Sequence, residues 1–126
     1  MCVAFASVKA QSTLKSTFDL ASDTVTNTGT VTLSVLAPGS YNKSTVQIAI
    51  TKISGTVGGT VTLQGSLDGV TYGTLDTTTY TATDVAGQSK IWVEDGNPVR
   101  YYRVSYAGTG TMSAIISAKL YQTKDN

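Results

Sequence analysis

The sequence predicts an all-β protein, an antiparallel β-sandwich of the jelly-roll or immunoglobulin-like kind with about eight strands. Apolar side chains alternate with polar ones along several segments, which is the two-residue period of a half-buried strand. Turns containing glycine, proline or asparagine separate these segments at intervals of about 8 to 12 residues, a spacing typical of sandwiches. No stretch has the period of a helix. The cysteine pattern of true immunoglobulin domains is absent, because the chain has one cysteine.

The first strands are expected between residues 18 and 36. Residues 18–27 suit a short strand or a bend, and Asn27-Thr-Gly29 is a turn signal. Thr30–Leu36 alternates apolar residues with threonine and serine, as a strand with one buried face does. Pro38-Gly39 ends this strand, because proline cannot donate to the hydrogen-bond ladder.

The longest alternating stretch, residues 44–76, is expected to organise the fold as a β-hairpin followed by the start of a third strand. Its first arm covers residues 44–54 and its return arm Thr60–Ser66. Gly55-Thr-Val-Gly-Gly59 is expected to be the hairpin turn, because glycine adopts the backbone angles that tight turns require.

Four further segments complete the predicted sandwich. Residues 77–83 are rich in threonine and suit an exposed edge strand. Three alternating strands follow, at residues 89–93, 100–106 and 111–121, and Glu94-Asp-Gly-Asn-Pro98 forms the strongest turn signal of the chain. The side chains expected to point into the core are Val31, Leu33, Val35, Val46, Ile48, Ile50, Val61, Leu63, Tyr102, Val104, Tyr106, Ala114, Ile116, Ala118 and Leu120.

The composition argues against several classes of partner. Charged residues make up only 13 % of the chain, the net charge is +1, and no cluster of lysine and arginine offers a footprint for nucleic acid or an anionic membrane. No window approaches the roughly 20 apolar residues that a membrane helix needs, and the N-terminus does not have the pattern of a secretory signal. The sparse charge favours association between protein molecules, since little self-repulsion keeps copies apart, and a monomer of low charge is the alternative.

Residues 1–17 are expected to form an N-terminal arm that leaves the domain and becomes ordered on a neighbouring molecule, with residues 18–126 forming the sandwich domain. No glycine or proline interrupts the arm. Phe5 and Val8 would be unfavourable in water, so both are candidates for contact with a partner. A frayed terminus or a first edge strand is the alternative interpretation of this segment.

No set of side chains predicts catalysis, a cofactor or a metal site. The chain has no histidine, the usual general base and the commonest metal ligand. Serine and threonine therefore have no histidine to activate them as nucleophiles. The acidic turns at Asp68-Gly69 and Asp95-Gly-Asn97 lack the alternating ligands and closing glutamate of a calcium loop. Most carboxylates lie in predicted turns, where aspartate bonds its own backbone, although they could also form an acid–base pair: these are Asp68, Asp76, Asp84, Glu94 and Asp95. The chain is accordingly expected not to be an enzyme.

The aromatic side chains are the best indication of binding. Strand alternation turns Tyr102 and Tyr106 inward and leaves Trp92 and Tyr101 facing outward, as a protein-contact patch or a sugar-stacking platform. Arg103 beside them could pair with a carboxylate across an interface, or belong to a solvated strand face. The predicted partner-binding residues are Phe5, Val8, Trp92, Tyr101 and Arg103.

Several motifs resemble those of small β-sandwich structural proteins of tailed bacteriophages. They are Gly59-Thr-Val-Thr-Leu-Gln-Gly-Ser-Leu-Asp-Gly-Val-Thr-Tyr72, Tyr101-Tyr-Arg-Val104, Gly108-Thr-Gly-Thr111 and Ala118-Lys-Leu-Tyr121. The chain looks most like the auxiliary or decoration-type virion proteins of podovirus-like phages, including those of gut Bacteroidota. The resemblance covers residues 45–121. Related sandwiches also occur in phage fibres and carbohydrate-binding modules.

The resemblance implies a non-enzymatic virion protein, present in many copies on the capsid surface and in the host cytoplasm during assembly. Its partners would be the major capsid protein or other virion proteins, and further copies of the chain. It would stabilise the junctions between capsomers, with the N-terminal arm as a clamp, and would need no cofactor, metal, nucleic acid or membrane. The alternatives are a carbohydrate-binding or adhesion module of a phage fibre, with Trp92 and Tyr101 as its platform, and a structural protein of the tail or neck.

Overall fold

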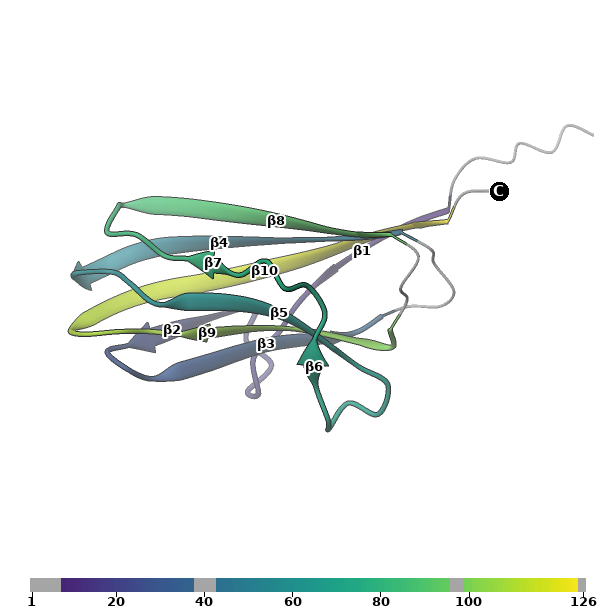
Figure 1. The fold of residues 1–126 in the computed structure, drawn as a ribbon, viewed down its shortest axis with the longest axis horizontal. Coiled ribbons are helices and arrows are strands. Elements are labelled where there is room, and N and C mark those ends of the chain that lie inside the picture. The colour runs from purple at the N-terminus through teal and green to yellow at the C-terminus, as the bar shows by residue number, and fades with distance from the viewer. Residues whose placement is uncertain (1–7, 38–42, 96–98, 125–126) are drawn as a thin grey trace, which may run out of the picture.

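The computed structural model describes residues 8–37, 43–95 and 99–124, which form two antiparallel sheets packed face to face (Figure 1). Sheet A has the strand order β1-β10-β4-β8, and β2 also pairs with β10. Sheet B has the order β3-β9-β5-β6, and β7 also pairs with β5. The predicted antiparallel sandwich is thus confirmed. The strands are β1 (Val8–Thr13), β2 (Ser22–Thr26), β3 (Thr30–Leu36), β4 (Lys43–Gly55), β5 (Thr60–Ser66), β6 (Gly73–Thr74), β7 (Tyr80–Thr81), β8 (Gly87–Asp95), β9 (Tyr101–Ala107) and β10 (Met112–Lys124).

The core lies between the two sheets and contains the side chains that alternation predicts. Leu33, Ile48, Leu63 and Val104 are fully buried, and Val31 and Val35 are half-buried against them. Full burial of such a side chain stabilises the fold by about 1.5–3 kcal/mol. The remaining predicted core residues are also buried: Val46, Ile50, Val61, Tyr102, Tyr106, Ala114, Ile116, Ala118 and Leu120.

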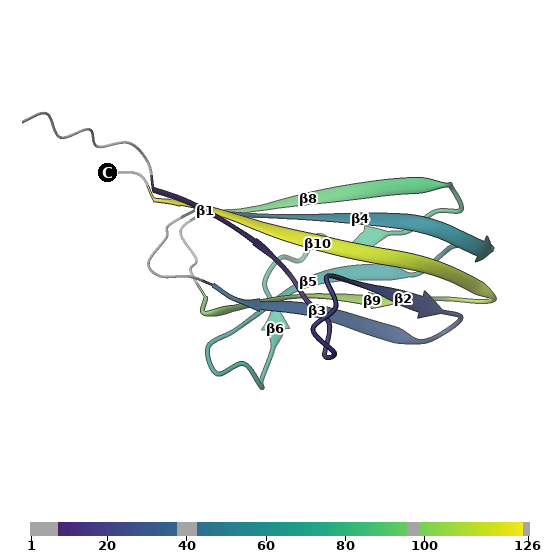
Figure 2. The ribbon, with the colours of Figure 1, turned by 180° about the vertical axis from the view of Figure 1, so that it is seen from behind.

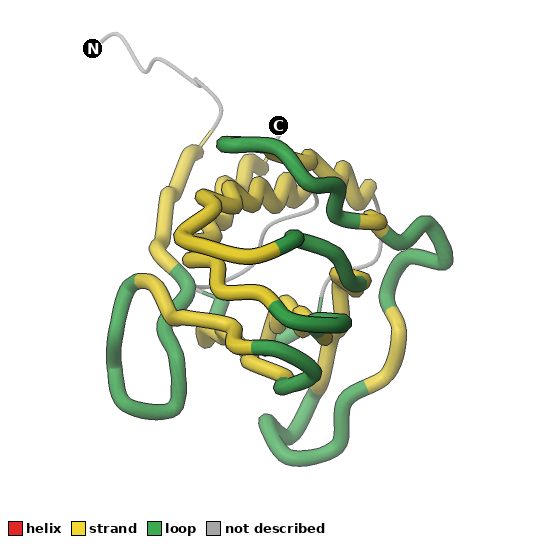
Figure 3. Tube along the Cα trace, turned by 90° about the vertical axis from the view of Figure 1, so that its left-hand side faces the viewer, coloured by secondary structure: helices red, strands yellow, loops and turns green. Residues whose placement is uncertain are grey.

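The predicted hairpin of residues 44–66 is wrong. Its first arm, β4, pairs with β10 and β8 in sheet A, and its second arm, β5, pairs with β9, β6 and β7 in sheet B. Residues 55–59 therefore carry the chain from one sheet to the other. The end-on view of Figure 3 shows the two layers and the loops that join them. The alternation of side chains decides which face of a strand is buried but not which strand lies beside it.

The crossing at residues 55–59 depends on its two terminal glycines. Gly55 and Gly59 have φ of 75° and 113°, backbone angles that side chains rarely adopt. A Cβ at Gly59 would collide with the carbonyl oxygen of Ala107, and one at Gly55 with that of Thr111. The amide of Thr56 donates to the Thr111 carbonyl at 3.0 Å, which holds the crossing against the neighbouring turn. The glycines were correctly placed in a turn, but this turn joins two sheets.

The described part of the predicted N-terminal arm belongs to the sandwich. β1 pairs with β10 from Val8, opposite Lys124, to Thr13, opposite Lys119, and runs along the edge of sheet A (Figure 2). Leu14 follows in the core with no exposed surface. Residues 8–14 therefore match the edge-strand alternative and not an arm that leaves the domain. Residues 1–7, which include Phe5, lie outside the described residues.

Residues 77–83 form an edge strand only at Tyr80 and Thr81, which make up β7. Side chains of β8 form hydrogen bonds with backbone groups before and after this short strand. The indole Nε1 of Trp92 donates to the Thr78 carbonyl at 2.7 Å. Gln88 accepts from the Thr83 amide at 2.9 Å and donates to the Thr83 carbonyl at 2.7 Å. The segment is thus held across the open edge between the two sheets.

Candidate functional site

Four cross-strand rows of side chains run across the outer face of sheet A. The register places the following side chains side by side: Gly87, Thr51, Ile115 and Thr24; Ser89, Ala49, Ser117 and Ser22; Ile91, Gln47, Lys119 and Thr13; Val93, Thr45, Tyr121 and Gln11. Lys119 is the only charged residue in these four rows. The next row of the same face holds three charged residues, in the order Asp95, Lys43, Thr123 and Lys9. The four rows are called the sheet A face below.

Apolar side chains are concentrated on β8 at one edge of the sheet A face. Val93 is 66 % exposed and Ile91 is 52 % exposed, and Ile115 and Tyr121 on β10 are each more than a third exposed. Single exposed apolar residues are common on protein surfaces. Ile91 and Val93 lie next to each other on β8, whereas Ile115 and Tyr121 lie beyond β4, so the apolar side chains form one pair and two single residues.

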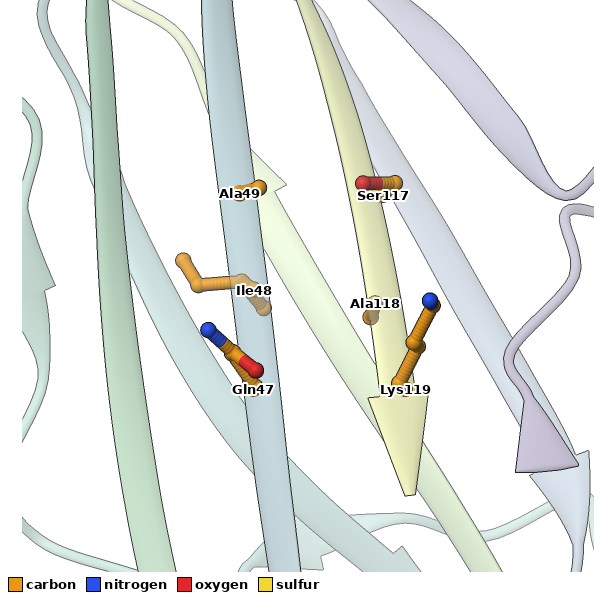
Figure 4. A pocket seen from close by; sticks show the side chains of 6 residues that line it. All are labelled: Gln47, Ile48, Ala49, Ser117, Ala118 and Lys119. Carbon is orange, nitrogen blue, oxygen red and sulfur yellow. The ribbon is translucent and has the colours of Figure 1, made fainter. Parts of the chain in front are cut away.

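A hollow of about 220 Å³ lies on the sheet A face between β4 and β10. Figure 4 shows Gln47 and Lys119 at one end of it, with Ala49 and Ser117 farther along the two strands. The small side chains of Ala49 and Ser117 stand directly opposite each other in the register, so little fills the space above the backbone there. The hollow is therefore a consequence of a paired alanine and serine in the middle of the sheet.

Trp92 does not face outward as predicted. It stands opposite Val46 in the register, is only 2 % exposed, and belongs to the core. Alternation gave two choices for β8, with Ile91 and Val93 on one face and Trp92 on the other, and the prediction turned Trp92 outward. The charged side chains of Lys90 and Glu94 are half-buried near the open edge of the sandwich, while Trp92 between them is buried. The residues that the prediction missed are Ile91 and Val93, which take the exposed positions.

Tyr101 and Arg103 lie on the outer face of sheet B and are not brought together with Trp92. The Arg103 guanidinium stacks on the ring of Tyr72, 3.8 Å from its centre, and its Nε donates to Gln64 at 2.7 Å. Tyr101 is half-buried, and its ring lies against Gly69, where a Cβ would come within 2.9 Å of the ring. Both side chains are thus engaged within the molecule. The predicted pair of outward aromatics, Trp92 with Tyr101, does not exist as a platform.

The loop after β1 carries an exposed apolar residue that sequence reasoning did not single out. Phe18, in the loop of residues 14–21, is 81 % exposed. The Ser16 hydroxyl accepts from the amides of Phe18 and Leu20 at 3.3 Å each, and the Ser16 amide donates to the Leu20 carbonyl at 2.8 Å. The loop that presents Phe18 is therefore tightly bonded. The serine two residues before the phenylalanine was the available signal.

Two carboxylates of the described residues accept hydrogen bonds from backbone amides, and one of them also pairs with a surface lysine. Oδ1 of Asp68 accepts from the amides of Val70 and Thr71 at 2.8 Å each, and these bonds, with one from Ser66, lower the pKa of Asp68 to about 2. Asp84 accepts from Lys52 at 2.9 Å and from the Val57 amide at 3.1 Å, which lowers its pKa. The bonds of Asp68 agree with the expectation that turn aspartates bond their own backbone, whereas Asp84 bonds Lys52 and Val57, which are far from it in the sequence.

Asp76 and Glu94 form the one interacting carboxylate pair that the described residues show. Desolvation raises the pKa of Glu94, and a hydrogen bond and repulsion from Asp76 add to this rise. The Thr78 amide lowers the pKa of Asp76. Across the described ranges, no group of three or more histidine, cysteine, aspartate or glutamate side chains is arranged to hold a metal ion. Nor does any helix there have the length and hydrophobicity to span a membrane.

Comparison with known proteins identifies the fold but no family. No family model matches the chain, and no curated protein matches it in sequence. Among solved structures it is similar to the PBSX exported protein XepA, with a TM-score of 0.57 and 15 % identity over 93 % of this chain and 37 % of XepA. It is also similar to a protein of Bacillus endospore appendages, described as a novel family of disulfide-linked pili (TM-score 0.52, 12 % identity, 100 % of this chain and 96 % of that one).

A third similar structure is the CBM22-1–GH10 portion of a Clostridium thermocellum xylanase, crystallised with xylohexaose. The TM-score is 0.52 and the identity 8 %, over 95 % of this chain and 26 % of the xylanase chain. The chain thus spans about a third of XepA and a quarter of the xylanase. Identities this low establish a shared sandwich fold and nothing about ligands.

Proposed function

We propose that this protein is a non-enzymatic structural protein of a virion, an auxiliary protein that binds the capsid shell in many copies and stabilises the junctions between capsomers. The observation that carries the proposal is the sheet A face, on which Ile91 and Val93 are exposed side by side and Lys119 is the one charged residue of the four rows. Such a face loses little hydration of charge when it meets another protein. The resemblance of residues 45–121 to decoration-type phage proteins is the reason for naming the capsid shell as the partner.

The similarity to the endospore appendage protein supports an assembly role. That chain is matched over 96 % of its length and is described as forming pili. A sandwich of this size can therefore serve as the building unit of a protein assembly without a further domain. Many modest contacts repeated by symmetry give such an assembly its strength.

The alternative of a carbohydrate-binding module has less support. It required Trp92 and Tyr101 as a stacking platform, and Trp92 is in the core while Tyr101 packs on Gly69. The similarity to a xylanase portion that contains a carbohydrate-binding module is a similarity of fold only. Placement at the tail or neck of the virion is a variant of the main proposal, since it requires the same kind of protein-binding face.

The test is co-sedimentation of the purified protein with shells of the major capsid protein of the same virus. We expect the wild-type protein to pellet with the shells and the Ile91→Ser/Val93→Ser double variant to lose at least tenfold in apparent affinity, because two exposed apolar contacts are removed. Leu36→Ser is the matched control, since Leu36 is 53 % exposed on the outer face of sheet B. Equal binding by all three proteins would reject the sheet A face as the contact. Absence of wild-type binding to shells, with binding to a tail or neck protein, would move the protein to that site.

A further inference from the structure

We propose that the Phe18 loop of one copy inserts into the hollow on the sheet A face of a second copy, with Asp19 of the first pairing with Lys119 of the second. This inference deepens the proposed function, on which it rests, by naming the contact that joins neighbouring copies. The contact would centre between β4 and β10, and the proposed shell contact at Ile91 and Val93 adjoins it on β8, because Ile91 stands opposite Gln47 at the end of the hollow.

The loop has the features of an inserting element. Phe18 is 81 % exposed at the tip of a loop that Ser16 closes with hydrogen bonds to Phe18 and Leu20. Leu14, at the base of the loop, is fully buried and its amide donates to the Ala118 carbonyl at 3.0 Å. The loop is thus anchored in the core and closed at its neck, so little conformational entropy is lost when the ring is buried.

The hollow has the size for a phenyl ring. Its volume is about 220 Å³ and it is open to solvent on one side, whereas the cavity of about 150 Å³ that binds benzene is closed, so the ring would be covered on one face only. Ala49 and Ser117 form its floor, with no side chain large enough to fill it. A phenyl ring over the pair would cover both the ring and the exposed backbone between the strands.

The charges beside the two partners are complementary. Asp19 follows Phe18 directly in the loop and is exposed, so a carboxylate lies one residue along the chain from the ring. Lys119 lines the hollow and is exposed. When the ring enters the hollow, the carboxylate comes to the side of the only charged residue on this part of the sheet A face. A rim ion pair of this kind adds little affinity but fixes orientation and favours the correct partner.

The loop and the hollow lie on different parts of the molecule, so one loop-to-hollow contact joins two unlike surfaces. The loop projects from the side of the sandwich beside β3 (Figure 2), while the hollow is on the outer face of sheet A. A contact made in one direction only leaves a free loop on one copy and a free hollow on the other, so that it continues into a ring or an open row. Two reciprocal contacts would instead close a two-fold dimer, and the mass of the wild-type assembly distinguishes the two arrangements.

A mixing experiment tests this directly, with sedimentation velocity as the measurement. Phe18→Ser removes the inserting ring, and Ala49→Tyr fills the hollow. We expect the wild-type mass to rise with concentration beyond that of a dimer, and each variant alone to stay monomeric. An equimolar mixture should give heterodimers and nothing larger, because the Ala49→Tyr copy still has its loop and the Phe18→Ser copy still has its hollow.

The controls are an equally exposed apolar residue and an equally placed tyrosine. Val70→Ser removes a side chain that is 82 % exposed on another loop, and Gln11→Tyr adds a ring to the sheet A face away from the hollow. Both should assemble as the wild type does. A monomeric wild type, or a mixture of the two blocked variants that remains monomeric, would overturn the proposal.

Charge exchange tests the pairing of Asp19 with Lys119. Asp19→Lys and Lys119→Asp should each weaken assembly about two- to fivefold or more, and the double variant should recover the wild-type affinity. No recovery in the double variant would remove the ion pair from the proposal. Shell co-sedimentation is measured separately. If the Phe18→Ser protein is monomeric and binds shells, but the mixture of variants forms no heterodimer, the loop-to-hollow contact alone is rejected. If heterodimers form but the protein does not bind shells, the proposed function alone is rejected.

Discussion

The outer faces of the two sheets differ in how many contacts their side chains already make within the molecule. On sheet B, Arg103 stacks on Tyr72 and bonds Gln64, and Tyr101 packs on Gly69 of a loop that folds back over the strand ends. On sheet A, Ile91 and Val93 are open to solvent, and none of the described residues covers the hollow between β4 and β10. A face whose groups are satisfied internally gains little by binding. The contrast supports sheet A as the proposed binding face, although Leu36 is 53 % exposed on sheet B and the predicted binding residues Tyr101 and Arg103 also lie there.

The largest expected effect is a difference in stability between substitutions on the inner and outer sides of β8. Trp92→Ala should destabilise the protein by about 3–5 kcal/mol, because it leaves a cavity in the core and an unpaired Thr78 carbonyl. Val93→Ala, one position along and 66 % exposed, should cost under about 1 kcal/mol. Urea denaturation of the two variants is the measurement. Similar losses in both would mean that β8 does not turn its tryptophan inward.

The sequence was sufficient to predict which side chains of most strands are buried. Val46, Ile48 and Ile50 are separated by polar or small residues, and only one face of that strand could be inward. At β8 the same rule failed, because Ile91 and Val93 on one face competed with Trp92 on the other. The area of one tryptophan, together with a hydrogen bond for its indole, outweighed two β-branched residues.

The sequence could not predict the pairing of strands or the sheet A face, for a different reason. β4 and β5 are neighbours in the chain and lie in opposite sheets, and nothing in their alternation distinguishes a hairpin from a crossing. The hollow arises because Ala49 and Ser117, far apart in the sequence, are opposite each other in the register. A site made from such pairs exists only after the register is known. Phe18 was visible as an apolar residue, but its exposure follows from the loop that Ser16 closes.

Substitutions of Arg103 measure how much the contacts on the outer face of sheet B contribute to stability. Arg103→Ala should destabilise the protein by about 0.5–1 kcal/mol, because the stacking on Tyr72 and the bond to Gln64 are both lost. Arg103→Lys keeps the charge but not the flat guanidinium, and should lose most of the same amount. A double-mutant cycle with Tyr72→Ala isolates the stacking. A coupling energy near zero would mean that the two side chains do not hold each other, and the contrast between the two faces would weaken.

The smallest expected effects are changes of stability with pH. They should have opposite signs at Asp68, in the loop over sheet B, and at Glu94, in sheet A. Asp68, in the loop that folds over sheet B, has a folded-state pKa of about 2, below its usual value. Its contribution to stability is therefore complete above the unfolded-state pKa and is lost as the pH falls from about 4 through 2. Asp68→Asn should lower stability at pH 7, and its difference from the wild type should shrink across that interval.

Glu94, at the end of β8 in sheet A, has a raised pKa because it is desolvated and lies beside Asp76. A raised carboxyl pKa means that the folded state holds the proton more tightly than the unfolded state. Stability from this group is therefore present below the unfolded-state pKa and is lost as the pH rises through the folded-state pKa. Glu94→Gln should make the protein more stable than the wild type at pH 7, with the advantage vanishing at low pH. Denaturation curves of both variants from pH 2 to 7 give the two slopes, and slopes of the same sign would contradict the burial of Glu94 beside Asp76.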